Sequence, residues 1–422
     1  MIVAPQHTHL ATWSIAALAT AGVIVRPFKL PEAVWAVLGA VVLVVAGLLP
    51  IGKAFEAVGK GADVYLFLIG MMLLSEVARR EGLFDWVAAV AVNRADRSPQ
   101  RLFLLIYGVG IVVTAFLSND AAAVVLTPAV YAATRKAKVE PLPYLFICAF
   151  IANAASFVLP ISNPANIVLY GDRTPALGVW LASFALPSLA AIVATYLALR
   201  FTEGRSLEAT CESGIATPEL SKGAWTAMAG LMLTAVVLMV VSARDMQLGL
   251  PTAIMGIVTT VIVLVASRTS PWETVKGVSW AVLPLVAGLF VLVEALVATG
   301  VIAEIGQLLT RSVSASPQAT AWSSGVLIAV VSNLMNNLPA GLIASSTIQL
   351  VHPPQQVVDA LLIGVDLGPN LSVTGSLATI LWLTAIRREG VDVGFWRFLR
   401  RGAVVMFPAL ILALAARLLM PA

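Results

Sequence analysis

The chain has 422 residues, of which 59% are apolar and only 11% are charged, whereas a soluble domain has roughly 25% charged residues. Apolar stretches long enough to cross a hydrocarbon core, about 17 to 25 residues each, recur along the whole length. The formal net charge of +4 does not indicate a nucleic-acid partner, because the basic residues lie in short loops, where they set membrane topology. These features exclude a soluble domain and indicate an all-α polytopic membrane protein.

In chain order, ten segments are predicted to cross the bilayer, and two more to enter and leave on one side as re-entrant hairpins. The first apolar run is interpreted as a span and not as a cleaved signal, because no charged region precedes it. The spans are 10–25, 31–50, 62–78, 143–170, 176–200, 223–242, 248–267, 279–299, 356–386 and 402–421, and the hairpins are 102–134 and 319–350.

Polar breaks interrupt each half of the chain at two places. In the first half they are the hairpin tip 118–120 and the break 160–164 inside a span; in the second half they are the tip 335–337 and the break 368–375. Proline removes a backbone donor and glycine permits unwound geometry, but a bilayer cannot satisfy free backbone groups. The breaks therefore predict broken helices that line a protein-enclosed, hydrated cavity.

The two halves align as repeats. Glu76 aligns with Glu294 at an offset of 218, Asn119 with Asn336 at 217, and 162–166 with 375–379 at 213. Offsets this constant indicate duplication. The division is residues 1–201 as the first repeat, 202–222 as a polar cytoplasmic linker, and 223–422 as the second repeat.

Loop charge predicts that the repeats are inverted. The stretch 79–101 holds five Lys and Arg residues and its counterpart 300–318 holds one, whereas 387–401 holds five and its counterpart 171–174 holds only Arg173. Because cytoplasmic loops carry the excess of positive charge, equivalent loops lie on opposite sides. The first hairpin then enters from the cytoplasmic side and the second from the periplasmic side, 20 of 26 basic residues are inside, and both termini are periplasmic.

The breaks also predict a binding site. Broken helices leave N-terminal amides unpaired, and their dipoles favour anionic or oxygen-rich ligands. Asparagine supplies both a donor and an acceptor, which suits a neutral polyhydroxylated solute or a partly dehydrated cation. The predicted substrate-binding residues are Ser118, Asn119, Asn163, Asn166, Asn336, Asn337, Thr374, Gly375 and Ser376.

Asp120 and Asp366 are the two carboxylates nearest the breaks. A charged aspartate at the bilayer centre costs on the order of 3 kcal/mol, so both are predicted to couple transport to protons; the other interpretation is that each caps a half-helix. Glu76 and Glu294 are interpreted as interfacial or ion-paired side chains, and Asp359 is expected at the periplasmic boundary.

No cofactor, metal site or catalytic residue is expected, and the chain is not expected to be an enzyme. Its two cysteines, Cys148 in a predicted span and Cys211 in the linker, cannot form a thiol cluster. A proton relay through His7, His9 or His352 is not expected, because all three map to outer edges.

Four motifs resemble the arsenical permease (ArsB) family of the ion transporter superfamily: SNDAAAVVLTP at 118–128, SNPANIV at 162–168, NNLPAGLIA at 336–344 and DLGPNLSVTGSLATILWL at 366–383. The resemblance runs nearly end to end. It implies extrusion of arsenite and antimonite, driven by inward proton movement across a bacterial inner membrane, in some members with a cytosolic arsenical pump ATPase as partner. Relatives often carry a lysine and a proline where this chain has 370–373, so coupling here is expected to rest on the aspartates.

Other functions remain open. A sodium/proton antiporter or a sodium-coupled anion carrier would use the same fold, although a dicarboxylate carrier favours Ser-Asn-Thr at both tips, which here are Ser-Asn-Asp and Met-Asn-Asn. An intramembrane protease would need two aspartates sharing one proton, but the sequence Ile-Gly-Val-Asp at 363–366 lacks the Gly-x-Gly-Asp pattern. A channel has no need of duplicated mid-membrane sites.

Overall fold

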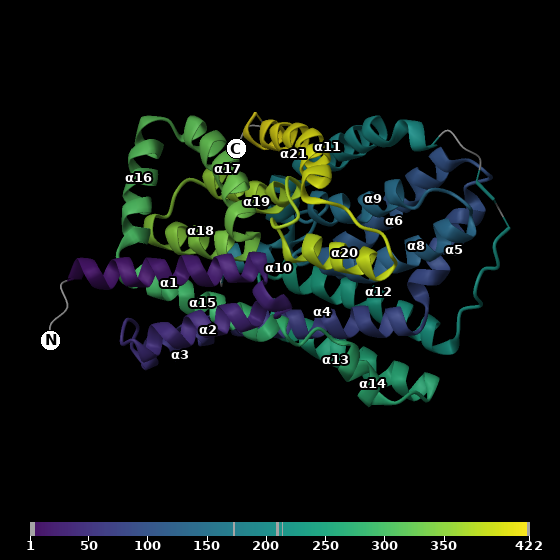
Figure 1. The fold of residues 1–422 in the computed structure, drawn as a ribbon, viewed down its shortest axis with the longest axis horizontal. Coiled ribbons are helices and arrows are strands. Elements are labelled where there is room, and N and C mark those ends of the chain that lie inside the picture. Colours follow the sequence, from purple (N-terminus) through teal and green to yellow (C-terminus); the bar gives the residue numbers. More distant parts are fainter. Residues whose placement is uncertain (1–4, 172–173, 208–210, 213, 420–422) are drawn as a thin grey trace.

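The computed structural model describes residues 5–171, 174–207, 211–212 and 214–419. Within these ranges the regular structure is helical and no strand occurs. Arg173, one of the six basic residues assigned to the outer side, lies outside the described residues. Most helices run along the long axis of the molecule, and Figure 1 shows them as two packed layers.

The first half of the chain forms eleven α-helices before the linker. They are α1 (Pro5–Val25), α2 (Glu32–Val45), α3 (Ile51–Lys60), α4 (Ala62–Arg80), α5 (Leu83–Arg94), α6 (Pro99–Leu117), α7 (Asn119–Ala121), α8 (Thr127–Lys136), α9 (Leu142–Ala154), α10 (Pro164–Tyr170) and α11 (Leu177–Glu203), and a π-helical turn, Ala122–Leu126, joins α7 to α8.

The second half has a similar order of helices. It contains α12 (Lys222–Ala243), α13 (Gly249–Ser267), α14 (Pro271–Gly277), α15 (Val282–Ala298), α16 (Val301–Ala315), α17 (Pro317–Met335), α18 (Asn337–Val351), α19 (Gln355–Leu367), α20 (Leu377–Arg388) and α21 (Phe395–Leu418). Each half has a hairpin (α6 to α8, and α17 with α18) followed by a broken helix (α9 with α10, and α19 with α20). The predicted all-α fold with inverted repeats, two re-entrant hairpins and two broken helices is confirmed.

The hairpins begin with the same local signal. Ser98 precedes Pro99 and Ser316 precedes Pro317, and each serine hydroxyl accepts a hydrogen bond from the backbone three residues later, at 3.3 Å and 3.2 Å. Serine is a favoured N-cap, and proline at the first helical position has no N–H that would need a partner. The chain therefore starts a helix at the same point of each repeat.

Four short helices replace segments that the sequence analysis treated as loops or as loop edges: α3, α5, α14 and α16. They contain 10, 12, 7 and 15 residues, too few to span a bilayer. Seven helices in the described chain are individually long and apolar enough to cross, and the bent pair α3 and α4 makes up to eight. Other predicted spans correspond to the shorter α2 and to the two broken helices, α9 with α10 and α19 with α20.

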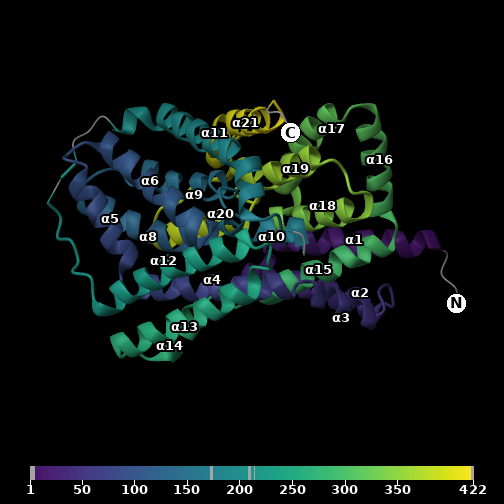
Figure 2. The same cartoon turned by 180° about the vertical axis from the view of Figure 1, so that it is seen from behind.

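The two layers are formed by different sets of helices. Helices α1 to α4 and α12 to α15 form one layer, here called the scaffold layer, which lies along the lower side of Figure 1; the hairpins, broken helices, α11 and α21 form the other, here called the hairpin layer. The view from behind in Figure 2 shows the same separation. Glycine sets the close crossings within each layer: a Cβ at Gly70 would collide with the Thr252 carbonyl in α13, and one at Gly364 with the Gly325 carbonyl in α17.

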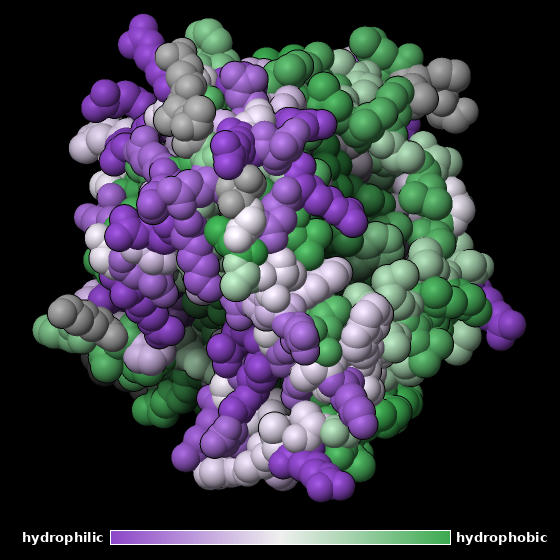
Figure 3. All heavy atoms as spheres, turned by 90° about the vertical axis from the view of Figure 1, so that its right-hand side faces the viewer, coloured by the Kyte–Doolittle hydropathy of each residue, from purple (hydrophilic) through white to green (hydrophobic). Residues whose placement is uncertain are grey.

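The linker lies at one end of the long axis, at the right of Figure 1, and the N-terminus lies at the other end. Glu212 of the linker pairs with Lys138 at 2.7 Å, and its amide donates to the Ala137 carbonyl at 2.9 Å. The hydrogen bond to Glu212 raises the pKa of Lys138. Figure 3 shows this end of the molecule, where hydrophilic side chains cover a broad area beside an apolar flank. The loops 94–101 and 135–138 are thus at the linker end.

Candidate functional site

The tips of both hairpins and the second halves of both broken helices meet at one small cavity. Its volume is about 10 Å³, which is close to the minimum that holds one water molecule. α4 and α15 of the scaffold layer close it with one apolar side chain each. The lining residues are Asn119, Asp120, Asn163, Pro164, Asn337, Leu338, Leu377, Ala378, Leu68 and Val282. We call it the central cavity.

Each half-helix that begins at the central cavity has a side-chain cap near its start. The Asn163 Oδ1 accepts from the Ala165 amide at 3.0 Å, the Ser376 Oγ from the Thr379 amide at 3.1 Å, and the Asn336 Oδ1 from the Leu338 amide at 3.2 Å. At the first tip the Asn119 Oδ1 accepts from the Asp120 amide at 2.9 Å. The caps satisfy some of the first amides, and the remaining partial positive charge of the helix starts faces the cavity.

The two tips have the same unusual backbone. Ser118 has φ 123° and Asn336 has φ 77°, both in the region that L-residues avoid. A hydrogen bond joins each hairpin to one helix break. The Asn337 amide donates to the Gly375 carbonyl at 2.8 Å, and the Ser162 hydroxyl donates to the Ala115 carbonyl at 3.0 Å. Strain that the surrounding structure maintains is typical of functional sites.

Asp120 and Asp366 lie in different surroundings. Asp120 lines the central cavity at the start of a half-helix, where the dipole favours its negative charge. Asp366 is fully buried near the C-terminal end of α19; its Oδ1 accepts from the Asn163 Nδ2 at 2.8 Å, and its Oδ2 has no partner among the described residues. A helix C-terminus disfavours a negative charge, and Asp366 lies inside α19, while the 3-10 helix that follows it (Gly368–Asn370) has no side-chain cap. The interpretation of Asp366 as a helix cap is therefore wrong.

The repeats exchange aspartate for asparagine at two equivalent positions. Asp120 at the first tip aligns with Asn337 at the second. Asp366 in α19 aligns with Asn153 in α9, 213 residues earlier in the chain and at the same place in its helix. Asn153 donates to the Asn370 Oδ1 at 3.0 Å, which joins the two breaks. Each repeat thus contributes one carboxylate and one neutral amide.

The remaining predicted binding residues are near the central cavity but do not line it. Asn166 donates to the Ser156 carbonyl at 2.8 Å and to two more carbonyls of the first break, so it holds that break together. The Thr374 hydroxyl donates to the Asn333 carbonyl at 3.1 Å, and Gly375 contributes its carbonyl to the second tip. Ser118 faces a neighbouring cavity on the linker side. These residues, with Asn336 and Ser376 as caps, position the site.

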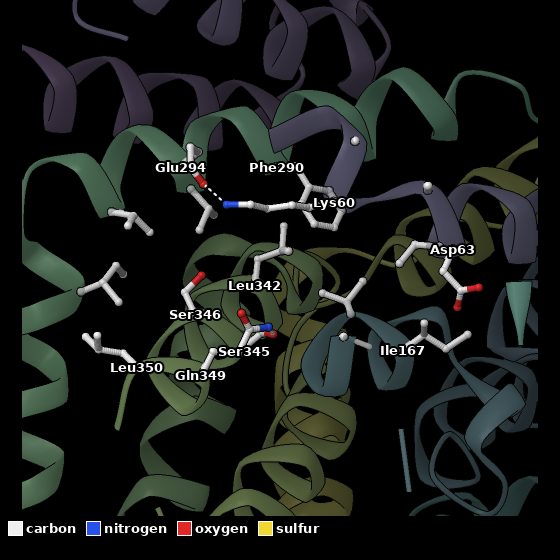
Figure 4. A pocket seen from close by; sticks show the side chains of 18 of the residues that line it. Lys60, Asp63, Ile167, Phe290, Glu294, Leu342, Ser345, Ser346, Gln349 and Leu350 are labelled. Carbon is white, nitrogen blue, oxygen red and sulfur yellow. Dashed lines mark hydrogen bonds and ion pairs between the residues drawn. The ribbon is translucent and has the colours of Figure 1, made fainter. Parts of the chain in front are cut away.

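A larger vestibule of about 700 Å³ lies on the other side of the central cavity, between the two layers. Figure 4 shows Lys60 reaching from the scaffold layer to Glu294 on α15, with Ser345, Ser346 and Gln349 on the opposite wall. The Lys60 Nζ lies 2.7 Å from the Glu294 Oε2. Val64, Ile167 and Leu342 line its inner part. Each lies about one helical turn from a residue of the central cavity, so a thin apolar barrier separates the two spaces.

The sequence did not predict a buried charge cluster near the start of α19. Asp359, which was expected at a boundary, is fully buried; its Oδ2 lies 2.7 Å from the Arg417 Nε, and its Oδ1 accepts from Tyr170 and Gln355 at 3.0 Å and 2.8 Å. The charges are paired, as buried charges must be. The feature of the sequence that could have indicated this cluster is Arg417, a basic residue inside an otherwise apolar last span.

Groups of three or more His, Cys, Asp or Glu side chains that could hold a metal do not occur among the described residues. Cys148 is buried in the middle of α9, and Cys211 is buried in the linker, where its amide donates to the Arg97 carbonyl at 3.2 Å. Any ligand at the central cavity would meet three amide side chains, one carboxylate and apolar side chains.

Broken helices and hairpin tips that meet at a small cavity with four polar side chains, in a chain with several membrane-spanning helices, define a polytopic membrane transporter. The chain belongs to the citrate transporter family, CitMHS, whose model matches residues 16–365. It is 29% identical over 369 residues to the arsenical pump membrane protein of Yersinia enterocolitica, covering 82% of this chain and 84% of the relative. With that of Escherichia coli the identity is 29% over 397 residues, covering 90% and 92%. The resemblance to the arsenical permeases is confirmed.

Two further comparisons extend this result. An uncharacterized transporter of Mycobacterium tuberculosis is 27% identical over 368 residues, with 84% of each chain covered. The crystal structure of the YdaH transporter of Alcanivorax borkumensis, which has an unusual topology, matches with a TM-score of 0.58 at 17% identity and covers 98% of this chain and 97% of that one. The latter match shows a shared fold.

Proposed function

We propose that the protein extrudes arsenite and antimonite from the cytoplasm of a bacterial cell in exchange for protons, by alternating access. The observation that supports this most is the composition of the central cavity, whose polar lining consists of amide side chains from both repeats and one carboxylate. Arsenite at neutral pH is an uncharged trihydroxide, which needs donors and acceptors but no counter-charge. The name of the similar pump proteins points to the same substrate.

The family name suggests citrate as the second candidate. Several helix starts facing one cavity favour an anion. A trianion, however, would gain most from Arg or Lys, and none of the described residues that line the central cavity is basic. Asp120 adds a negative charge that repels an anion. The site therefore favours the neutral solute.

The proton coupling rests on Asp120 and Asp366, because each can be neutral or charged where its equivalent in the other repeat is a permanently neutral asparagine. Asp366 has a single donor and an oxygen without a described partner, an arrangement that suits a protonated carboxyl. Protonation from the outer side would favour substrate release there, and proton loss on the inner side would restore binding.

The sidedness belongs to the same proposal. Residues 1–201 and 223–422 are the inverted repeats, the linker 202–222 is cytoplasmic, and both termini are periplasmic. A cytosolic ATPase partner, which the resemblance to arsenical permeases implies, would dock at the linker end. Sodium coupling, as in an antiporter or an anion carrier of the same fold, is the competing mechanism.

Transport into everted membrane vesicles tests the proposal. With an acidic lumen, arsenite and antimonite should accumulate, and citrate should not, because the lumen corresponds to the periplasm. Replacing sodium with potassium should leave the uptake unchanged. Accumulation of citrate without arsenite, or arsenite uptake that requires sodium, would overturn it.

A further inference from the structure

A second cavity joins the central one on the side of the linker. It has a volume of about 70 Å³ and shares Leu68, Asp120, Pro164 and Val282 with the central cavity. This volume has room for more than one water molecule. In this structure Asp120 is therefore open towards the linker end, whereas the outer vestibule does not include it. We call this space the inner passage.

Glu76 on α4 lies at the other end of the inner passage. Its side chain is buried, yet it lines both the inner passage and an open cavity of about 580 Å³ at the protein surface. Glu76 and Gly277 are the described residues common to these two spaces, and of the two only Glu76 can hold a proton. Among the described residues, Glu76 is thus the titratable side chain that lines both the passage from Asp120 and the open surface cavity.

The carboxylate of Glu76 is held in place. The Arg79 Nε donates to one oxygen at 2.8 Å and the Arg79 Nη2 to the other at 2.7 Å. A Cβ at Gly277 would collide with Glu76, so the glycine lets the end of α14 close over it. The charged groups around Glu76 are Arg79 and Arg80 on its own helix, Asp85 on α5, Glu273 and Lys276 on α14, and Asp120 across the passage.

Glu76 and its repeat equivalent Glu294 have different ion-pair partners. Glu294 is paired with Lys60 from the neighbouring helix α3 at 2.7 Å. Glu76 is paired with Arg79 of its own helix, whose side chain is half exposed, and Lys276 of α14 lines the same open cavity. A half-exposed arginine can remain in solvent while Glu76 is briefly neutral.

We propose that Glu76 receives the proton that Asp120 releases on the cytoplasmic side and passes it to the cytosol. The proton moves from the Asp120 carboxyl through water in the inner passage to the Glu76 carboxylate, which leaves Asp120 charged. Glu76 then loses it to bulk water beside Arg79. This inference rests on the proposed proton exchange at Asp120 and adds the residue through which that proton leaves.

The test compares Glu76→Gln with Glu273→Gln in everted vesicles of the full chain. Glu273 lines only the open surface cavity and pairs with Arg80, so it is the matched control. Glu76→Gln should slow arsenite accumulation driven by an acidic lumen by about tenfold or more. It should leave arsenite–arsenite exchange at equal pH unchanged, since exchange releases no net proton and shows that the variant is folded. Glu273→Gln should match the wild type in both assays.

A further variant separates a relay from a structural ion pair. Arg79→Gln removes the pair but keeps the carboxylate, so pH-driven accumulation should persist with a shifted pH profile. Wild-type accumulation by Glu76→Gln, or a loss in Arg79→Gln as large as in Glu76→Gln, would overturn the relay. Absence of pH-driven accumulation in the wild type would instead overturn the proposed function itself.

Discussion

At the scale of single residues, the sequence predicted the polar side chains near the central cavity but could not separate those that line it from those that support it. Asn119, Asn163 and Asn337 line the central cavity, whereas Asn166 and Thr374 bond to backbone carbonyls of the breaks. An unwound helix must satisfy its own carbonyls, and the same polar residue types do this and bind solutes. Spacing alone cannot separate the two roles.

Asn163 combines two roles that substitutions can separate. Asn163→Ser keeps an N-cap for α10 but removes the donor to Asp366, whereas Asn163→Ala removes both. We expect Asn163→Ala to lower the free energy of unfolding by about 1 kcal/mol relative to Asn163→Ser, and both to impair pH-driven arsenite accumulation alike. Thermal unfolding in detergent and vesicle uptake measure the two effects. Wild-type coupling in Asn163→Ser would show that Asp366 does not need this amide.

At the scale of elements, hydrophobic length predicted the long spans well and the short helices poorly. Helices α3, α5, α14 and α16 contain charged residues and are too short to cross, so their sequences predicted loops. The hairpins were predicted because loop charge required the chain to return to the same side. The glycine crossings were not predicted, since the partner of a glycine on another helix cannot be found from one sequence.

The crossing of α17 and α19 offers a test at this scale. Gly364→Val places a branched side chain against the Gly325 backbone, which cannot move away without separating the helices, and should cost about 1 to 3 kcal/mol or more. Gly108→Val on α6 is the control, because a Cβ at Gly108 meets no atom within 4 Å. The measurement is the thermal midpoint of each purified variant. Equal midpoints would contradict the close crossing.

At the scale of the whole molecule, the linker and the basic loops share one end, and the N-terminus lies at the opposite end. Which end faces the cytosol rests on the positive charge of those loops. The fold itself was predictable because duplicated breaks at matching positions leave few alternatives. The close contacts between the layers were not, because they depend on tertiary packing.

Single cysteines introduced at Lys136 and at Arg94 test the sidedness. Both positions are exposed at the linker end, so an impermeant thiol reagent should label them only from the cytosolic side. Lys53, exposed on α3, is the opposite control and should be labelled from outside. Labelling of position 136 from outside intact cells would contradict both the orientation and the first hairpin.

The central claim is that arsenite leaves in exchange for protons carried by a carboxylate at the central cavity. The most direct test is arsenite accumulation in everted vesicles, with and without an acidic lumen, by the wild type, Asp120→Asn and Asp366→Asn. Asparagine keeps the shape and the hydrogen bonding of the protonated acid while removing the charge. We predict that Asp120→Asn loses accumulation against a gradient but retains downhill arsenite exchange, and that Asp366→Asn is likewise uncoupled. Undiminished pH-driven accumulation by both variants would contradict the account.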